Sequence, residues 1–297
     1  MYIISYNKGG LSNRIKSLVS CLRYSNENNI NCILKWDILD NYNKNIHLLN
    51  CNFNLLFKIN NIINILNFNL DEQNEILNNN KNKFYKSHCL MIFDKDNIPN
   101  NFNTFVSKCS IKFSTNDKYN RNIDNMYTKI PQNVIDNYLP YFKQIQLIDE
   151  LQEKVEHFAS QNFNEQTVSV HIRSWNRNGE KGRRNFLFNI KKFEDEMKKM
   201  ILENKLIGYH NIKFFLATDS QEVKDYFTKE YEYKNLIVVY SRQTDLDTSR
   251  DFPEGIQEDA IELFLLAKNK SLIGSHFSSY SEVAWWLGGC TNKVVIL

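Results

Sequence analysis

Hydrophobic and polar positions alternate between strand-like and helix-like patterns throughout the second half of the chain. Apolar runs of strand length, rich in β-branched residues, occur at 168–172, 213–217, 236–240, 271–274 and 293–297. Segments in which apolar residues recur every three to four positions occupy 190–205, 221–231, 258–269 and 279–287. Strands separated by helices of this length predict parallel βαβ units, which bind ligands at the carboxyl ends of their strands.

The start of the chain shows the same pattern. A strand at 2–6 and a glycine turn precede a helix, for which Ser12 is the predicted N-cap, and a second strand follows at 32–36. The pattern then weakens, although we expect a helix at 59–66. A further helix at 147–160 leads into the second domain. We therefore predict an α/β protein with one domain at 1–146 and another at 147–297.

Composition narrows the class of protein. The 297 residues are 42% hydrophobic and 24% charged, which suits one or two globular domains. The net charge of +3 argues against a nucleic-acid partner, and the only basic cluster with a neighbouring aromatic is at 181–184, beside Trp175. The six cysteines form no CxxC pair, so we expect reduced thiols. With no signal-peptide or membrane-spanning pattern, the expected location is cytoplasmic.

The first candidate site lies at 8–14, directly after the first predicted strand. Gly9 and Gly10 allow a tight turn, and the helix that follows offers free N–H groups to an anion, close to Asn13 and Arg14. The segment is neither a Walker A loop nor a GxGxxG fingerprint. By itself it is typical of an ordinary strand-to-helix turn.

The second candidate site is the strand end at 168–173 with the polar loop after it. His171 and Arg173 close an apolar strand, which puts a planar cation where a phosphate binds in an α/β crevice. Glu180 in the loop is a candidate general base, if its surroundings raise its pKa. The structural alternatives are a salt bridge for Arg173, a buried core histidine for His171, and a surface ion pair of Glu180 with Arg183 or Arg184.

Two more polar groups follow predicted strands. Asp219 or Ser220 is expected to cap the next helix, a structural role that we prefer to catalysis. Ser278 and Ser279 lie in a serine-rich turn before a helix, where hydroxyl and backbone N–H groups form a second anion site.

These elements, in this order, resemble the superfamily of α-1,6, α-1,2, nodulation-type and protein O-fucosyltransferases. The resemblance rests on segments 9–14, 171–173, 215–219, 260–262 and 277–279, of which the HxR element at 171–173 is the most specific. It leaves 37–146 unmatched. Ser174 replaces the second arginine of the α-1,6 and α-1,2 branches, the loop at 178–180 is similar to the nodulation-type branch, and Trp285-Trp286 is similar to the α-1,2 branch. The branch and the acceptor therefore stay open.

The resemblance implies an α/β, GT-B-like architecture: two Rossmann-type domains with mainly parallel sheets facing a cleft. The C-terminal domain would bind GDP-fucose, and no cofactor or metal is required. Arg173 would hold the β-phosphate, His171 would border the guanine, and Glu262 would replace the aspartate that pairs with guanine N1–H and N2–H. The remaining donor-binding residues expected are Gly10, Asn13, Arg14, Asp219, Ser278 and Ser279.

We therefore expect an inverting, metal-independent glycosyltransferase that moves fucose from GDP-fucose to a hydroxyl of a glycan or glycoprotein, with Glu180 and Arg173 as its catalytic residues. The alternatives are an enzyme for another nucleotide sugar and an inactive nucleotide- or sugar-binding relative. A metal-dependent enzyme would need a DxD pair. The two such triplets, at 94–96 and 245–247, are expected to be surface loops.

Overall fold

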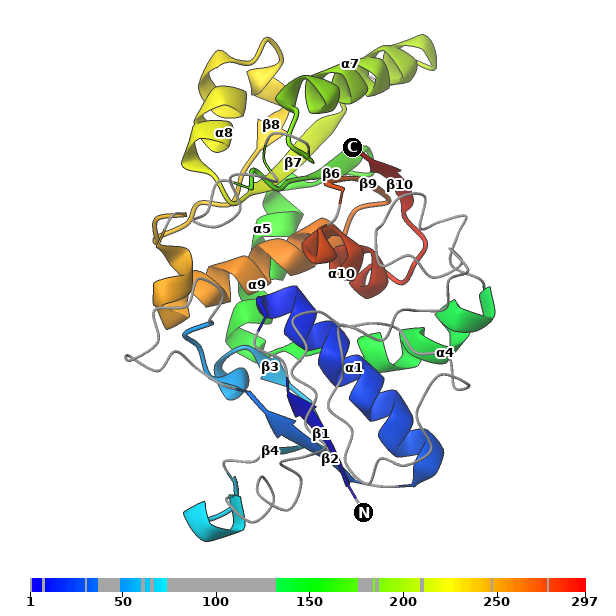
Figure 1. Cartoon of the computed structure of the whole chain (residues 1–297). Helices are drawn as coiled ribbons and strands as arrows, with labels where there is room; N and C mark the ends of the chain where they lie inside the picture. The colour runs from blue at the N-terminus through cyan, green and yellow to red at the C-terminus, as the bar shows by residue number, and fades with distance from the viewer. Residues whose placement is uncertain are drawn as a thin grey trace. The chain divides into compact units, whose positions relative to one another are not determined.

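The computed structural model describes residues 2–6, 9–29, 31–36, 49–59, 62–64, 67–73, 132–175, 184, 187–208, 211–246, 248–276 and 278–297. The described residues form two compact units, one ending at Ile148 and the other running from Asp149 to Leu297 (Figure 1). The boundary expected from the sequence lies after residue 146.

The first unit contains a parallel sheet in the order β1-β2-β4. Its strands are β1 (Tyr2–Tyr6), β2 (Asn31–Lys35) and β4 (Ile63–Asn64), and helix α1 (Leu11–Asn28) connects the first two. Helix α4 (Gln132–Phe142) lies against α1, where the guanidinium of Arg23 sits 4.4 Å from the ring centroid of Tyr138. A second, antiparallel pair joins β3 (Phe57–Lys58) to β5 (Gln146–Leu147), next to the short 3-10 turn Phe53–Leu55.

Two expectations for this unit are wrong. Gly10 is the N-cap of α1, so Ser12 lies inside the first turn of the helix. The segment expected to be a helix at 59–66 contains the strand β4, which pairs in parallel with β2. Periodicity does not separate a helix from a strand in so short an apolar run, and pairing with the existing sheet decides the outcome.

The second unit is built on a five-stranded parallel sheet in the order β10-β9-β6-β7-β8. The central strands are β6 (Thr167–Ile172), β7 (Lys213–Thr218) and β9 (Ser271–Gly274), and the edges are β8 (Ile237–Val238) and β10 (Lys293–Ile296). All six residues of β6 are buried, as expected of a strand covered on both faces.

Helices cover both faces of this sheet (Figure 1). On one face, Val168, Val170 and Ile172 pack with the core residues of α7 (Ile190–Leu206) and α8 (Gln221–Asp225). On the other face lie α5 (Asp149–Asn162), α9 (Pro253–Ala267) and α10 (Ser279–Leu287), and the Ser169 hydroxyl donates to the Leu266 carbonyl of α9 at 2.8 Å. Because side chains alternate along a strand, His171 shares the α9 and α10 face with Ser169.

Some boundaries of this unit differ from the expected ones. The helix expected at 221–231 is α8 followed by a π-helical turn, Tyr226–Glu230, and short 3-10 turns follow at Lys234–Leu236 and Ser249–Asp251. The helix expected from residue 258 begins at Pro253, where a fixed proline φ suits the first helical position.

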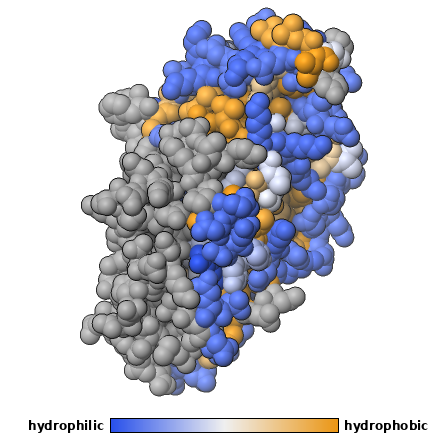
Figure 2. Space-filling model, turned by 90° about the vertical axis from the view of Figure 1, so that its right-hand side faces the viewer, coloured by the Kyte–Doolittle hydropathy of each residue, from blue (hydrophilic) through white to orange (hydrophobic). Residues whose placement is uncertain are grey.

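The cysteines inside the described ranges, Cys21, Cys32, Cys51 and Cys290, are buried free thiols. Cys89 and Cys109 lie outside these ranges. In the part of the chain that the structure describes, none of the helices has the length and apolar character needed to cross a membrane. Figure 2 shows a surface that is mostly hydrophilic where it is coloured, with apolar side chains gathered at the top of the view.

Candidate active site

Three polar residues come directly after central strands of the second unit. They meet at the carboxyl ends of these parallel strands, which we call the sheet edge. Arg173 follows β6, Asp219 follows β7, and Ser275 follows β9. The Arg173 guanidinium donates to Asp219 Oδ2, and the Arg173 backbone N–H donates to Ser275 Oγ at 2.8 Å. The Ser174 N–H donates to Asp219 Oδ1 at 2.7 Å. Parallel strands thus bring three separate stretches of sequence into one hydrogen-bonded group.

Arg173 is fixed in orientation by its surroundings. Its side chain and that of Asp219 are each 11% exposed, and its guanidinium lies 5.3 Å from the ring centroid of Trp175. Trp175 has a left-handed backbone, with φ of 55°, and is buried. A planar cation held by a carboxylate and an aromatic ring is suited to bind a diphosphate.

Asp219 is the partner of Arg173 and does not cap the next helix. Ser220 is the N-cap of α8, because its hydroxyl accepts the Val223 N–H. Of the two residues expected to cap this helix, the structure assigns the role to Ser220.

His171 is a buried, neutral histidine. Its Nδ1 lies 2.6 Å from Ser281 Oγ, and its ring centroid lies 4.8 Å from that of Tyr280. Burial lowers the pKa of His171 to about 3, although the charge of Asp219 opposes the shift. An imidazole with so low a pKa does not serve as a general base near neutral pH.

The N-terminus of α10 lies beside this group. Ser278 is its N-cap residue and is buried, and Ser279 is its first residue. Ser281 Oγ, which contacts His171, also accepts the Ser275 N–H at 3.2 Å. A Cβ on Gly274 would lie 2.8 Å from Ile296 Cδ1 and 2.9 Å from Ser281 Cβ, so α10 approaches β9 this closely because residue 274 is glycine.

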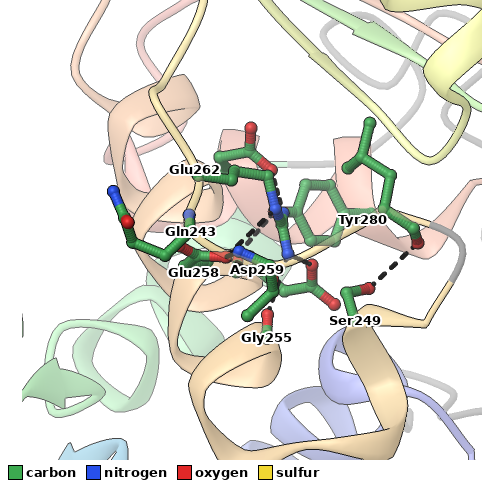
Figure 3. Close-up of polar contacts among 10 residues, drawn as sticks. Gln243, Ser249, Gly255, Glu258, Asp259, Glu262 and Tyr280 are labelled. Atoms are coloured by element: carbon green, nitrogen blue, oxygen red, sulfur yellow. Dashed lines mark hydrogen bonds and ion pairs between the residues drawn. The ribbon is translucent and has the colours of Figure 1, made fainter.

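A second polar cluster, drawn in Figure 3, surrounds Arg242, which the sequence analysis does not identify. Its side chain is 2% exposed and donates to Glu262 Oε2 at 2.6 Å, Asp259 Oδ1 at 2.9 Å and the Gly255 carbonyl at 3.0 Å. The Arg242 Nε lies 3.4 Å from Glu258 Oε2. The sequence does contain a signal for it, since an arginine shortly after a predicted strand end repeats the placement of Arg173.

Glu262, the predicted guanine acceptor, belongs to this Arg242 cluster. It is buried, and burial raises its pKa to about 7 against the opposing charge of Arg242. In Figure 3 one carboxylate oxygen of Glu262 takes part in the contact and the other points away from it. Its role toward guanine stays a prediction.

Tyr280 connects the Arg242 cluster to His171, next to the group formed by Arg173, Asp219 and Ser275. Its ring faces His171, and its hydroxyl donates to the backbone carbonyl of Asp259 at 2.5 Å. Two predicted donor-binding residues of the second unit, His171 and Glu262, are therefore connected through Tyr280 and the Arg242 cluster.

The predicted residues of the first unit lie around the start of α1. Gly10 is its N-cap, and Arg14 is buried, with its Nε donating to the Gly9 carbonyl at 2.8 Å and its guanidinium 5.0 Å from the ring centroid of Trp36. The buried Asn13 Oδ1 has no hydrogen-bond partner within the described ranges. The Arg14 side chain thus stabilises the glycine turn. The Asn13 amide oxygen is available to accept a hydrogen bond.

Several predicted residues lie outside the described residues, among them Glu180, Phe277, Arg183, Asp247 and the triplet at 94–96. Arg184, one of the two proposed surface partners of Glu180, lies 3.3 Å from Glu222. Leu246, between the acidic residues of the second DxD triplet, is buried. Within the described ranges no group of three or more histidine, cysteine or acidic residues is arranged to hold a metal ion.

No protein-family model and no curated protein sequence matches the chain. Solved structures do. The fucosyltransferase NodZ from Bradyrhizobium is 14% identical, with 95% of this chain and 90% of that chain covered and a TM-score of 0.54. POFUT1 in complex with GDP is 10% identical, with 100% and 98% covered and a TM-score of 0.51.

A variant of FUT1 from Arabidopsis thaliana, also in complex with GDP, is 13% identical, with 100% of this chain and 70% of that chain covered and a TM-score of 0.55. At such low identities the comparison establishes the fold and leaves the function to be argued from the site. The chain therefore has the GT-B-like α/β fold of NodZ, POFUT1 and FUT1, as the sequence resemblance implies.

Proposed function

We propose that the protein is an inverting, metal-independent glycosyltransferase that moves fucose from GDP-fucose to a hydroxyl of a glycan or glycoprotein. The observation that carries the proposal is the Arg173 and Asp219 ion pair at the sheet edge, beside the hydroxyl-bearing N-terminus of α10. A NodZ α-1,6-fucosyltransferase structure of the same fold was soaked with GDP-fucose, which supports this donor.

The departing diphosphate is the group that this site is suited to stabilise. As the bond from fucose to GDP breaks, negative charge grows on the β-phosphate, and a preoriented guanidinium lowers the energy of that transition state. The free N–H groups of the first turn of α10 add a positive potential close to the same edge. Neither contribution requires a metal ion.

Removal of the acceptor proton needs a different group. His171 is buried and neutral, with its Nδ1 on Ser281, so we do not assign the base to it. Glu180 stays our candidate, because an inverting transfer needs a base on the face opposite the departing GDP, and a carboxylate in the loop after Arg173 would be near both the phosphate-binding strand and the acceptor side. In the first unit we assign Gly10 and Asn13 to the donor and give Arg14 the task of bracing their turn.

A donor screen tests the proposal. The protein is incubated with GDP-fucose, GDP-mannose and UDP-sugars, each with and without EDTA, over a panel of glycans, and nucleotide release is measured. We expect nucleotide release only when GDP-fucose is the donor, and we expect EDTA to leave the rate of release unchanged. Turnover of a different donor, or turnover abolished by EDTA, contradicts the proposal.

Arg173→Lys is the matched variant for this screen. It keeps the positive charge but loses the planar fork, so we expect it to keep its fold and lose most of its turnover. The replacement of the second HxR arginine by Ser174 favours one competing function, a protein that binds GDP without transfer. GDP binding without any turnover in the screen would select that function.

A further inference from the structure

The Arg242 cluster has more negative than positive side chains. Three acidic residues of α9, Glu258, Asp259 and Glu262, face the single guanidinium of Arg242. Both Arg242 and Glu262 are buried, at 2% side-chain and 6% residue exposure. A buried arrangement of this kind is costly unless each carboxylate has its own donors.

The three carboxylates differ in what they bind. Glu258 accepts the backbone N–H groups of Gln243 and Thr244 and the Thr244 hydroxyl, so it holds the segment after β8 in place. Asp259 accepts from Arg242. Glu262 uses Oε2 for Arg242, and within the described ranges its Oε1 makes no hydrogen bond. Asp259 Oδ2 likewise makes no hydrogen bond within the described ranges, but the Asp259 side chain is 20% exposed and that of Glu262 only 8%. Glu262 is therefore the more buried carboxylate with an oxygen left for a ligand.

We infer that Arg242 is a positioning residue, which orients the Glu262 carboxylate so that the site selects guanine over other bases. This inference rests on the proposed function, in which Glu262 pairs with the guanine of the donor. Guanine presents two adjacent donors, N1–H and N2–H, which an ionised carboxylate accepts together. Adenine presents an acceptor at N1, which the same carboxylate repels.

The position of Glu262 fits this role. Tyr280 contacts both His171, which the resemblance assigns to the guanine, and Asp259 of the Arg242 cluster. A base that borders His171 thus lies one tyrosine ring away from the carboxylate that Arg242 holds. The Arg242 fork spans two carboxylates and the Gly255 carbonyl, so rotation of the Glu262 carboxylate would break a charge-assisted hydrogen bond.

The ionisation of Glu262 depends on the same contact. Burial raises the pKa of Glu262 to about 7, and Arg242 is the nearest group that opposes this rise. The charged and titratable groups that act on Glu262 or respond to it are Arg242, Asp259, Lys224, Tyr240 and Tyr280. Loss of Arg242 removes the main group that lowers the pKa of Glu262, so a larger share of Glu262 is protonated at a given pH. A protonated carboxyl presents a hydroxyl to one of the guanine donors.

The test compares the affinities of GDP and inosine diphosphate, which lacks only the 2-amino group, by calorimetry. For the parent we expect GDP to bind about tenfold or more tightly than inosine diphosphate, since one charge-assisted hydrogen bond is at stake. In Arg242→Gln we expect GDP affinity to fall about tenfold or more and the ratio of the two affinities to approach one. Arg242→Lys should lie between, because a point charge replaces the fork.

The pH profile adds a readout that a merely structural role would not move. GDP affinity of the parent should rise with pH as Glu262 loses its proton, between about pH 6 and 8. In Arg242→Gln the same rise should occur at higher pH. In the double variant Arg242→Gln with Glu262→Gln, the GDP preference should equal that of Glu262→Gln alone, because Arg242 acts through Glu262.

Glu258→Gln is the matched control. It removes the charge that faces Arg242 Nε at 3.4 Å and weakens the bonds that hold the segment after β8, but it leaves Glu262 Oε2 bonded to Arg242. We therefore expect a lower Tm with an unchanged ratio of GDP to inosine diphosphate affinity. If Arg242→Gln and Glu258→Gln weaken both nucleotides equally, Arg242 is structural and the inference is wrong. If the parent binds no GDP, the proposed function fails as well, whereas GDP binding with an unaltered ratio in both arginine variants overturns only the inference.

Discussion

At the scale of single residues, the ion pair between Arg173 and Asp219 holds the Arg173 guanidinium in place at the proposed site of the departing diphosphate. Asp219→Asn replaces one acceptor oxygen by an NH2 group, which then faces a donor of Arg173 or Ser174. Since a partly buried cation loses its partner, we expect the free energy of unfolding to fall by about 3 kcal/mol, measured by urea titration. Turnover of GDP-fucose should fall as well.

Asp225→Asn is the control for this variant. Asp225 is a surface residue of α8 that pairs with Lys229 and Gln221. We expect its replacement to leave both the urea midpoint and turnover at the parent values. Equal stability of Asp219→Asn and the parent would show that the ion pair does not hold Arg173.

The lowered pKa of His171 makes the free energy of unfolding depend on pH. Its pKa is about 3 in the folded chain and about 6.5 in the unfolded chain, so between these values the unfolded state binds the extra proton. The contribution of His171 is therefore complete above about pH 6.5 and is lost as the pH falls. Between pH 7 and pH 5 it removes about 2 kcal/mol from the free energy of unfolding.

Comparison with His171→Gln isolates this contribution, because Glu262 acts in the opposite direction. The raised pKa of Glu262 makes the folded state bind the extra proton between about pH 4.5 and 7. Chemical unfolding of both proteins at several pH values should therefore show a shallower acid decline in His171→Gln. The exposed His157, changed to Gln, should leave the parent profile unaltered.

At the scale of elements, the close approach of α10 to β9 depends on Gly274. In Gly274→Ala the new Cβ would meet Ile296 Cδ1 at 2.8 Å and Ser281 Cβ at 2.9 Å, so the helix or the β10 strand has to move. We expect a loss of about 1–3 kcal/mol in the free energy of unfolding, together with weaker GDP binding, because Ser281 and Ser278 shift with the helix. Urea titration and calorimetry measure the two effects.

A second change makes this prediction sharper. Ile296→Val removes the Cδ1 atom and so relieves one of the two collisions. The double variant Gly274→Ala with Ile296→Val should therefore be more stable than the sum of the two single losses implies. Strict additivity would mean that the crowding at Gly274 is not the cause.

The helices and strands of the second half can be predicted from the sequence because the hydrophobic pattern of each segment matches its burial in the fold. The strand β6 is a continuous buried run between helices, so its apolar residues identify both its type and its central place. The misread segment at 59–66 is the opposite case, since β4 becomes a strand through pairing with β2 and has no periodicity of its own. The sequence predicts Ser12 as the N-cap of α1, yet the N-cap is Gly10.

The candidate site can be predicted from the sequence only in part, because its contacts join segments that are far apart in the chain. Arg173 and Asp219 each follow a strand, and the sequence therefore indicates that both lie at the sheet edge. Their pairing depends on the order β6-β7, which the sequence does not state. The sequence pattern does not identify the Arg242 cluster, because the α9 partners of Arg242 are about 15 to 20 positions away along the chain and contact it only in the folded structure.

At the scale of the whole molecule, a ligand that binds only the native state should raise the stability of the unit that holds it. GDP at about 100 times its Kd should add about 2.7 kcal/mol to the free energy of unfolding, seen as an upward shift of Tm. We expect UDP and ADP to give smaller shifts, because neither offers the guanine donors to Glu262. An equal shift with all three nucleotides would rule out Glu262 as the selecting group.

Hydrogen exchange locates the same effect along the chain. With GDP bound, we expect slower exchange at 171–175 and at the start of α10, where Arg173 and Ser278 lie. Helix α7, on the other face of the sheet, should exchange at its unliganded rate. Protection spread evenly over both units would contradict a donor site centred on this sheet edge.

The bond between His171 and Ser281 gives the protein a built-in spectroscopic reporter. The imidazole stays neutral over the usual range of pH, so its ring 15N resonances do not drift with buffer. Their frequencies depend instead on the bond from Nδ1 to a serine in the first turn of α10. Occupancy of this end of the sheet is thus observable by nuclear magnetic resonance on a natural side chain, before a donor or an acceptor has been identified.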